Sequence, residues 1–153
     1  MTSVTIAPAR VEDLSAILAL ERASPEAPHW TEAQYREILS PAPNALERVL
    51  LTASSPAGIV GFAVVKLAGS AEAELETIAV APANRRGGIG RALGAAIIAR
   101  TWQRGARQMA LEVRASSEAA IALYRSLGFV VTGRRPRYYA LPEEDAVLMR
   151  FER

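Results

Sequence analysis

Hydrophobic residues recur along the chain with two spacings, one typical of β-strands and one typical of α-helices. Short β-rich runs bounded by proline, glycine or serine predict strands, whereas apolar residues three or four positions apart predict amphipathic helices. Strands are expected at residues 4–7, 46–53, 59–67, 74–80, 108–114, 129–132 and 146–149. Helices are expected from Asp13 to near Ser24-Pro25, over 32–39, over 89–102, and from Ser116 or Ser117 to Leu127.

The order of these elements predicts how the strands pair. Three strands between residues 46 and 80 follow one another with short connections, which is typical of an antiparallel meander. A helix separates strand 74–80 from strand 108–114, so these two strands should lie parallel. Residues 134–145 are polar with two tyrosines, and we expect a loop there. We therefore expect one domain over residues 1–153, an α/β (α+β) fold with a mixed, mostly antiparallel sheet of about seven strands and about four helices.

The composition excludes several kinds of protein. No apolar run is long enough to cross a membrane and no basic-then-apolar leader opens the chain, so we expect a cytoplasmic protein without a membrane partner. The absence of cysteine excludes disulfides and thiolate chemistry, and a single histidine, His29, argues against a metal site. Residues 101–153 carry nine arginines against six acidic residues. This bias suits an anionic ligand but is too weak to predict direct nucleic-acid binding.

Residues 81–90, which follow strand 74–80 and include the start of helix 89–102, contain two arginines and three glycines. Glycine lets backbone N–H groups approach an anion, and the first helical turn points further N–H groups at it, so the segment is typical of phosphate binding. It could equally be an ordinary turn with solvated arginines. Gly88-Ile-Gly90-Arg-Ala-Leu-Gly94 also resembles a dinucleotide-binding fingerprint with Glu112 as its acidic residue. In that fingerprint, however, the first glycine follows the strand almost directly, whereas here a loop lies between them. A P-loop is excluded because no Gly-Lys-Ser or Gly-Lys-Thr follows.

A family resemblance gives a third interpretation of this segment. Arg85-Arg-Gly-Gly-Ile-Gly90 resembles the Arg/Gln-x-x-Gly-x-Gly/Ala signature of the GNAT acetyltransferases. In that family the loop grips the pyrophosphate of acetyl-coenzyme A (acetyl-CoA), and the preceding strand, here Thr77 to Val80, lines the pantetheine arm. The resemblance implies acetyl-CoA as the acetyl donor and no metal. The cofactor-binding residues that it implies are Ile78, Ala79, Val80, Arg85, Arg86, Gly87, Gly88, Ile89, Gly90, Arg91 and Ser117.

Two later stretches narrow the resemblance. Residues 111–129, which begin Leu-Glu-Val-Arg-Ala-Ser-Ser, are similar to the Leu-Glu-Val-Arg-Ala-Ser-Asn block of the ribosomal-protein-alanine N-acetyltransferases (RimI). Residues 135–146 with Met149 resemble the Arg…Tyr-Tyr…Glu-Asp-Ala…Met tail of that family, and Pro28–Glu32 resembles its Pro-Trp-Ser-Glu segment. Ser117 replaces the family asparagine that is expected to contact the pantetheine arm. That contact is either lost, made through water, or exchanged for helix capping.

Acetyl transfer needs an amine that has lost a proton, a polarised thioester carbonyl and a proton for the departing thiolate. By resemblance, Glu112 is the general base, directly or through water, and Tyr124 is the general acid. The backbone N–H of Val80 would hold the carbonyl oxygen. Without the resemblance, Glu112 could face solvent on an alternating strand, and Tyr124 could be a core residue with its hydroxyl at the surface.

The acceptor is the least defined part of the prediction. Trp30, Tyr138 and Tyr139 either line a groove for a substrate peptide or cover the end of the core. The resemblance implies acetyl transfer to the N-terminal α-amino group of a protein, first of all the alanine N-terminus of a small-subunit ribosomal protein. We expect Glu143, Glu144 and Asp145 to attract an arginine-rich acceptor.

Three alternatives to this acceptor and activity stay open. The same fold could act on a small-molecule amine or on a lysine side chain, or it could bind coenzyme A without turnover. We expect a monomer or a weak homodimer.

Overall fold

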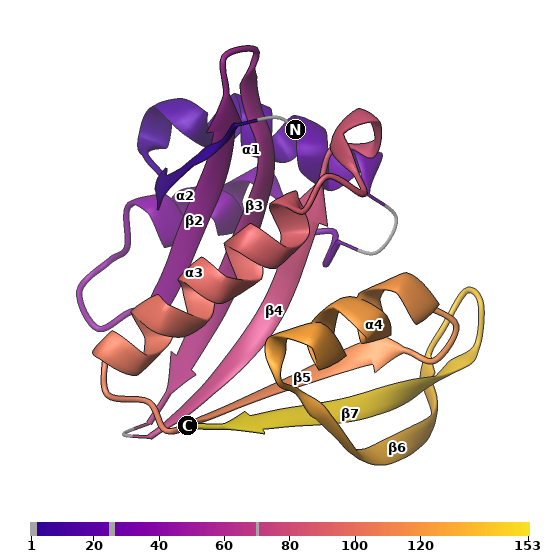
Figure 1. Cartoon of the computed structure of the whole chain (residues 1–153). Helices are drawn as coiled ribbons and strands as arrows, with labels where there is room; N and C mark the ends of the chain where they lie inside the picture. Colours follow the sequence, from indigo (N-terminus) through magenta and orange to yellow (C-terminus); the bar gives the residue numbers. More distant parts are fainter. Residues whose placement is uncertain (1–2, 25–26, 70) are drawn as a thin grey trace.

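The computed structural model describes residues 3–24, 27–69 and 71–153, so the predicted helix end at Pro25 lies outside the described residues. Within them, seven strands form one sheet in the order β1-β2-β3-β4-β5-β7-β6 (Figure 1). All neighbours are antiparallel except β4 and β5, which are parallel as predicted. The mostly antiparallel sheet confirms the predicted fold class and excludes a doubly wound dinucleotide-binding domain. The strands are β1 (Thr5–Pro8), β2 (Arg48–Ser55), β3 (Gly58–Ala68), β4 (Glu72–Val80), β5 (Gln108–Arg114), β6 (Val130–Tyr139) and β7 (Glu144–Glu152).

Four α-helices of the described residues cover the two faces of this sheet. On one face lie α1 (Leu14–Ala23) and α2 (Glu32–Leu39), and on the other lie α3 (Ile89–Gln103) and α4 (Glu118–Leu127) (Figure 1). Two short 3₁₀ turns, η1 (Val11–Asp13) and η2 (Pro82–Asn84), precede α1 and α3. The helix pairs therefore make one hydrophobic core on each face of the sheet.

The two cores hold the helices to the sheet. The core beneath α3 and α4 contains side chains that are at most 2% exposed, among them Leu93, Ile97, Met109, Phe129 and Met149. The core beneath α1 and α2 contains fully buried Ile17, Tyr35, Phe62 and Val64. Burial of one such large side chain contributes roughly 1.5–3 kcal/mol to stability. These cores make the sheet a rigid platform for the site described below.

A β-bulge in β4 decides which face its side chains occupy. The pairing of β4 with β3 shifts register at Glu76, which is left as an extra residue. A bulge breaks the two-residue alternation of a strand. Leu75, before the bulge, therefore lies in the core beneath α3, whereas Ala79, after it, lies in the core beneath α1 and α2. Ile78 and Val80 consequently pack toward α3 and α4.

The sheet opens between its two parallel strands. β4 and β5 pair only at Glu72–Glu74 with Gln108–Ala110. Beyond these residues the strands diverge, and α4 lies over the β5 side while α3 lies over the β4 side (Figure 1). Backbone N–H and C=O groups that face the opening are available to a ligand, because no neighbouring strand takes them up there.

The predicted loop at residues 134–145 is wrong. β6 continues to Tyr139 and β7 begins at Glu144, so the turn between them covers only residues 140–143. β6 is the edge strand of the sheet, and its side chains are almost all exposed. An edge strand that faces water on both sides has no hydrophobic alternation, so its sequence does not look like a strand. Its backbone pairing with β7 forms it instead.

Candidate active site

A cleft of about 600 Å³ lies on the α3/α4 side of the sheet, where β4 and β5 diverge. The end of β4, the loop before α3, the first turn of α3 and one side of α4 form its walls. Most of the predicted cofactor-binding residues line it: Ile78, Ala79, Val80, Arg85, Arg86, Gly88, Ile89, Gly90 and Arg91. Gly87 and Ser117, also predicted, are not among the lining residues.

The backbone of the loop before α3 is shaped for an anion. Arg86 and Gly88 adopt left-handed conformations, with φ of 65° and 83°, and glycine does so without the steric cost of a side chain. The first helical hydrogen bond runs from Ala92 N to the Gly88 oxygen at 3.0 Å. The N–H groups of the first turn therefore lack intrahelical acceptors and, with the helix dipole, favour negative charge. These residues fit a pyrophosphate group.

Glu112 lies on the face of the sheet opposite this cleft. Its neighbours Leu111 and Val113 belong to the core beneath α3 and α4, and strand alternation places Glu112 on the other side of β5. Its carboxylate lies 3.7 Å from the Arg135 guanidinium. A second cavity, of about 400 Å³, lies on that face and is lined by Glu74, Glu112 and Arg135, together with Glu72, Thr132 and Arg150.

Tyr138 brings the β6–β7 hairpin to Glu112. Interaction of its hydroxyl with the Glu112 carboxylate, together with partial burial, raises the pKa of Tyr138 above its usual value. The Arg135 guanidinium lies 5.4 Å from the centroid of the Tyr138 ring. Tyr139 is half-buried, with the Arg114 guanidinium 4.4 Å from its ring centroid, and burial raises the pKa of Tyr139 as well. The predicted base and the two predicted groove tyrosines thus lie together.

Trp30 lies apart from this group and contributes to the core beneath α1 and α2. Its ring lies 5.5 Å from Tyr35, and the Arg48 guanidinium lies 5.3 Å from its centroid. The backbone N–H of Trp30 donates to Glu21 Oε1 at 3.0 Å, and the Tyr35 hydroxyl donates to the other oxygen of the same buried carboxylate. Trp30 lines neither cavity described above. Its position favours the interpretation that it covers the core.

Tyr124 and Ser117 both lie on the donor side, on α4. Tyr124 is half-buried against the core beneath α3 and α4, with its ring 6.0 Å from Phe129, and it follows the cleft-lining Leu123. Ser117 is buried at the N-cap position of α4. The two predicted catalytic residues therefore lie on opposite faces of the sheet, on the two sides of its opening.

The Val80 N–H points into that opening. Ala81 N donates to the Val60 oxygen on β3 at 2.8 Å. Because backbone groups of an antiparallel strand alternate in direction, the N–H and C=O of Val80 point away from β3, toward β5. The Val80 oxygen accepts a hydrogen bond from Arg85 Nε at 3.2 Å, which fits this direction. A donor aimed at the opening is what a developing negative charge on a carbonyl oxygen requires.

Sequence reasoning missed several residues around the opening. Ser24 and Ala27, which flank the α1–α2 connection, line the cleft. The Ser24 hydroxyl is buried without a hydrogen-bond partner in the described part of the chain, so it is available to a ligand. Arg135 belongs to the tail of residues 135–146 that resembles the family, but its contact with Glu112 depends on pairing between strands that are far apart in the sequence. Asn84 and the α4 residues Ala119 and Ala120 were also missed.

The described residues contain neither a metal-binding cluster nor a membrane-spanning helix. No group of three or more His, Cys, Asp or Glu side chains among them could hold a metal ion. None of the helices in the described ranges is both long and apolar enough to span a membrane.

Residues 13–129 match the acetyltransferase (GNAT) family. The chain is 38% identical over 148 residues to the ribosomal protein bS18-alanine N-acetyltransferase of Escherichia coli (strain K12), a match that covers 95% of each protein. It is 45% identical over 97 residues to an uncharacterized protein of Mycobacterium leprae (strain TN), a match that spans 61% of this chain and only 26% of that protein. The crystal structure of the ribosomal-protein-S18-alanine N-acetyltransferase from Escherichia coli is similar with a TM-score of 0.82, at 33% identity, over 98% of this chain and 94% of that chain.

Proposed function

The chain belongs to the GNAT acetyltransferase family, and because it is thus an acetyl-CoA-dependent N-acetyltransferase, we propose that its acceptor is the N-terminal α-amino group of a protein. The acceptor proposed first is the alanine N-terminus of a small-subunit ribosomal protein, after the substrate named for the relative from Escherichia coli. The match to that relative covers 95% of both chains, so it includes the strands on both sides of the opening.

One observation carries this proposal. Glu112 borders the opening on one face, while the cleft that suits acetyl-CoA lies on the other face. An acceptor that enters the 400 Å³ cavity on this face reaches Glu112, and the donor would bind on the other side of the opening. A slender chain end carrying a primary amine suits this geometry, because it presents its reacting nitrogen at its tip.

In this proposal the chain's own residues have the following roles. The N–H groups at the start of α3, with Arg85 and Arg86, hold the pyrophosphate of acetyl-CoA. The Val80 N–H stabilises the carbonyl oxygen as negative charge develops on it. Glu112 takes the proton of the amine, directly or through water, and Tyr124 returns a proton to the leaving thiolate. Tyrosine suits this role because the hydroxyl of an unperturbed tyrosine side chain titrates near pH 10.

The amine's own acidity favours an α-amino group over a lysine. An α-amino group has a pKa of about 7.7–8.0, whereas that of lysine is about 10.4. At one unit per 1.36 kcal/mol, removal of the ammonium proton costs roughly 3–4 kcal/mol less for the chain terminus. A single carboxylate such as Glu112 is therefore better matched to an α-amino acceptor than to a lysine side chain.

A panel of acceptors tests this proposal. We would measure kcat/KM from thiol release with alanine-initiated peptides, the same peptides with a blocked N-terminus and an internal lysine, and small amines. We expect the alanine-initiated peptides to be preferred by at least about tenfold, which corresponds to 1.4 kcal/mol of transition-state binding. A preference for lysine or a small amine would replace the acceptor, and absence of thiol release with every amine would favour a non-catalytic coenzyme A-binding module.

A further inference from the structure

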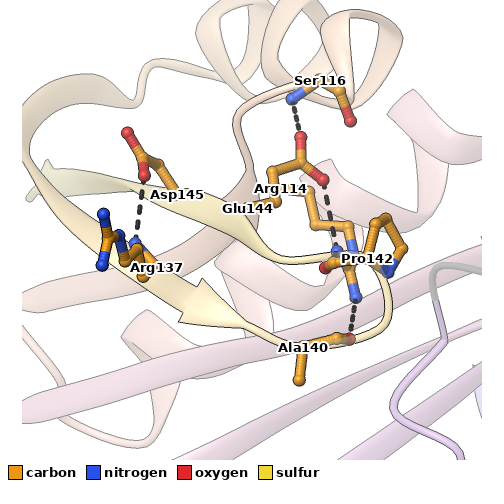
Figure 2. A network of polar contacts seen from close by, with 7 residues as sticks. All are labelled: Arg114, Ser116, Arg137, Ala140, Pro142, Glu144 and Asp145. Carbon is orange, nitrogen blue, oxygen red and sulfur yellow. Dashed lines mark hydrogen bonds and ion pairs between the residues drawn. The ribbon is translucent and has the colours of Figure 1, made fainter.

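Glu144 joins two parts of the molecule that are far apart in the sequence. It accepts a hydrogen bond from the Ser116 N–H at 2.6 Å and another from Arg114 Nη1 at 3.2 Å (Figure 2). Arg114 also donates to the carbonyl oxygens of Pro142 at 3.1 Å and Ala140 at 3.4 Å, on the turn between β6 and β7. We call Arg114 and Glu144, with these contacts, the hairpin clamp. It ties the end of β5 and the start of α4 to the β6–β7 hairpin.

The hairpin clamp is better shielded from water than the ion pair beside it. The side chains of Arg114 and Glu144 are 27% and 16% exposed. Arg137 and Glu143, at the tip of the same hairpin, lie 3.4 Å apart and are 82% and 68% exposed. Exposed pairs contribute little, whereas shielded hydrogen bonds to charged groups hold geometry firmly. The hairpin clamp therefore fixes the hairpin, and the exposed pair serves as a matched comparison.

The clamp connects the elements that carry the two halves of the proposed active site. Ser116 immediately precedes Ser117, the N-cap residue of α4, and α4 forms one wall of the cleft proposed for acetyl-CoA. The hairpin carries Arg135, whose guanidinium lies 3.7 Å from the Glu112 carboxylate on the acceptor side, and Tyr138, which also interacts with Glu112. The Glu144 carboxylate thus links the start of α4 to the hairpin on the acceptor side.

We propose that Arg114 and Glu144 are positioning residues that couple the acetyl-CoA cleft to the acceptor side, the part of the molecule that carries Glu112, Tyr138 and Tyr139. When acetyl-CoA packs against α4, it holds the Ser116 N–H and, through it, Glu144 more firmly, and the hairpin with Tyr138 and Tyr139 is thereby held more firmly for the acceptor. This inference rests on the proposed function, because it treats the two tyrosines as acceptor contacts. By thermodynamic linkage, bound acceptor strengthens coenzyme A binding by the same factor.

The test compares wild type with Glu144→Gln by calorimetry. Gln keeps an acceptor oxygen but loses the charge that binds both Arg114 and the Ser116 N–H. Coenzyme A should tighten binding of an alanine-initiated peptide about tenfold in wild type, within the usual range of coupling between sites, and about twofold or less in the variant. The peptide KM should rise about tenfold with kcat changed much less, because neither clamp residue touches the reacting atoms.

Two further variants separate the clamp from general effects of charge. Glu143→Gln removes an equal charge from the same hairpin at the exposed pair and should keep wild-type coupling. Arg114→Lys keeps the positive charge but loses the planar fork that reaches Glu144 and two carbonyl groups at once. It should lose coupling nearly as far as Glu144→Gln does.

Hydrogen exchange gives a reading that needs no acceptor. Addition of coenzyme A should protect backbone amides of residues 137–146 in wild type and should leave them unprotected in Glu144→Gln. Wild-type coupling and protection in Glu144→Gln would overturn the inference, even if the melting temperature fell. An equal loss in Glu143→Gln would also overturn it. Refusal of every peptide by wild type would contradict the proposed function instead, and the exchange experiment would still decide about the clamp.

Discussion

Two groups of β6, the Arg135 guanidinium and the Tyr138 side chain, interact with the Glu112 carboxylate. Both contacts keep its carboxylate at the edge of the opening, where an incoming amine would have to pass. A base that is held before the substrate arrives needs no reorganisation during proton transfer. Tyr138 and Arg135 therefore belong to the working environment of Glu112 in the mechanism that we propose.

Replacement of Glu112 by Gln should lower kcat by about 10²–10⁴, because the amide keeps the shape of the carboxylate but cannot accept the proton. The affinity for acetyl-CoA should change little, since the cleft lies on the other face of the sheet. The defect should become smaller as the pH rises above about 8, where the α-amino group loses its proton unaided. Steady-state kinetics from pH 6.5 to 9.5, with calorimetry of acetyl-CoA binding, would measure both effects.

Glu74→Gln is the matched control for Glu112. It removes a carboxylate that lines the same 400 Å³ cavity and pairs with Lys66 at 3.0 Å. Its kcat should stay within about threefold of wild type, because a partly exposed ion pair contributes only about 0–1 kcal/mol. If both variants turned over at the same rate, Glu112 would be one surface carboxylate among others on this face.

Among the elements, the β6–β7 hairpin is held in position by the Glu144 carboxylate, whose pKa is lowered in the folded protein. Hydrogen bonds from Ser116, and then from Arg114, lower the pKa of Glu144 below its usual value. A lowered pKa in the folded state means that the unfolded chain binds the proton more tightly. The stabilisation from Glu144 is therefore present above about pH 4.5 and is lost as the pH falls through the lowered pKa.

Glu144→Gln should consequently reduce stability most at neutral pH. The difference in unfolding free energy between wild type and variant should be constant from pH 7 to about 5 and should shrink as the pH falls below about 4.5. Urea unfolding at several pH values between 3 and 7 would follow this difference. A difference that stayed constant down to pH 3 would show that the charge of Glu144 does not stabilise the hairpin.

The contact between α3 and α4 depends on Gly94. A Cβ atom at this position would overlap the Leu127 side chain and lie 3.4 Å from Ile78 Cδ1. Gly94→Val should force the helices apart, at a cost of about 1–3 kcal/mol in unfolding free energy, and should weaken acetyl-CoA binding because both helices wall the cleft. Ala95→Val, at an exposed position of the same helix, is the control for β-branching alone. Equal losses in the two variants would remove the packing argument.

At the scale of the whole molecule, acetyl-CoA would join elements that touch one another little at the opening. A ligand that binds only the folded protein stabilises it by about 2.7 kcal/mol at a hundred times its Kd. Acetyl-CoA should therefore raise the melting temperature markedly, and an acetylated pantetheine fragment without the pyrophosphate should raise it much less. Thermal melts with matched concentrations would measure this, and equal shifts would argue against the loop before α3 as the anion site.

The amino-acid sequence was sufficient to locate the elements whose side chains pack against a core. Hydrophobic periodicity located the four helices and six of the seven strands to within a few residues, because burial leaves a pattern of one period in each element. Short connections predicted the antiparallel meander, and the intervening helix predicted the parallel pair. The connection between β4 and α3 was also predicted from its consecutive glycines and arginines, and its use as an anion site stays a prediction.

How these parts meet depends on contacts between residues that are far apart in the sequence. The bulge at Glu76 moves the side chains of the following residues to the opposite face of the sheet. The pattern of polar and apolar positions does not show where a strand contains such an extra residue. The length of β6 depends on backbone bonds to β7, because both faces of this edge strand are exposed. The grouping of Glu112 with Arg135 and Tyr138, and of Arg114 with Glu144, joins residues that local periodicity treats as independent. Their proximity follows from strand pairing over long sequence distances, and a pattern that extends over a few neighbours does not encode it.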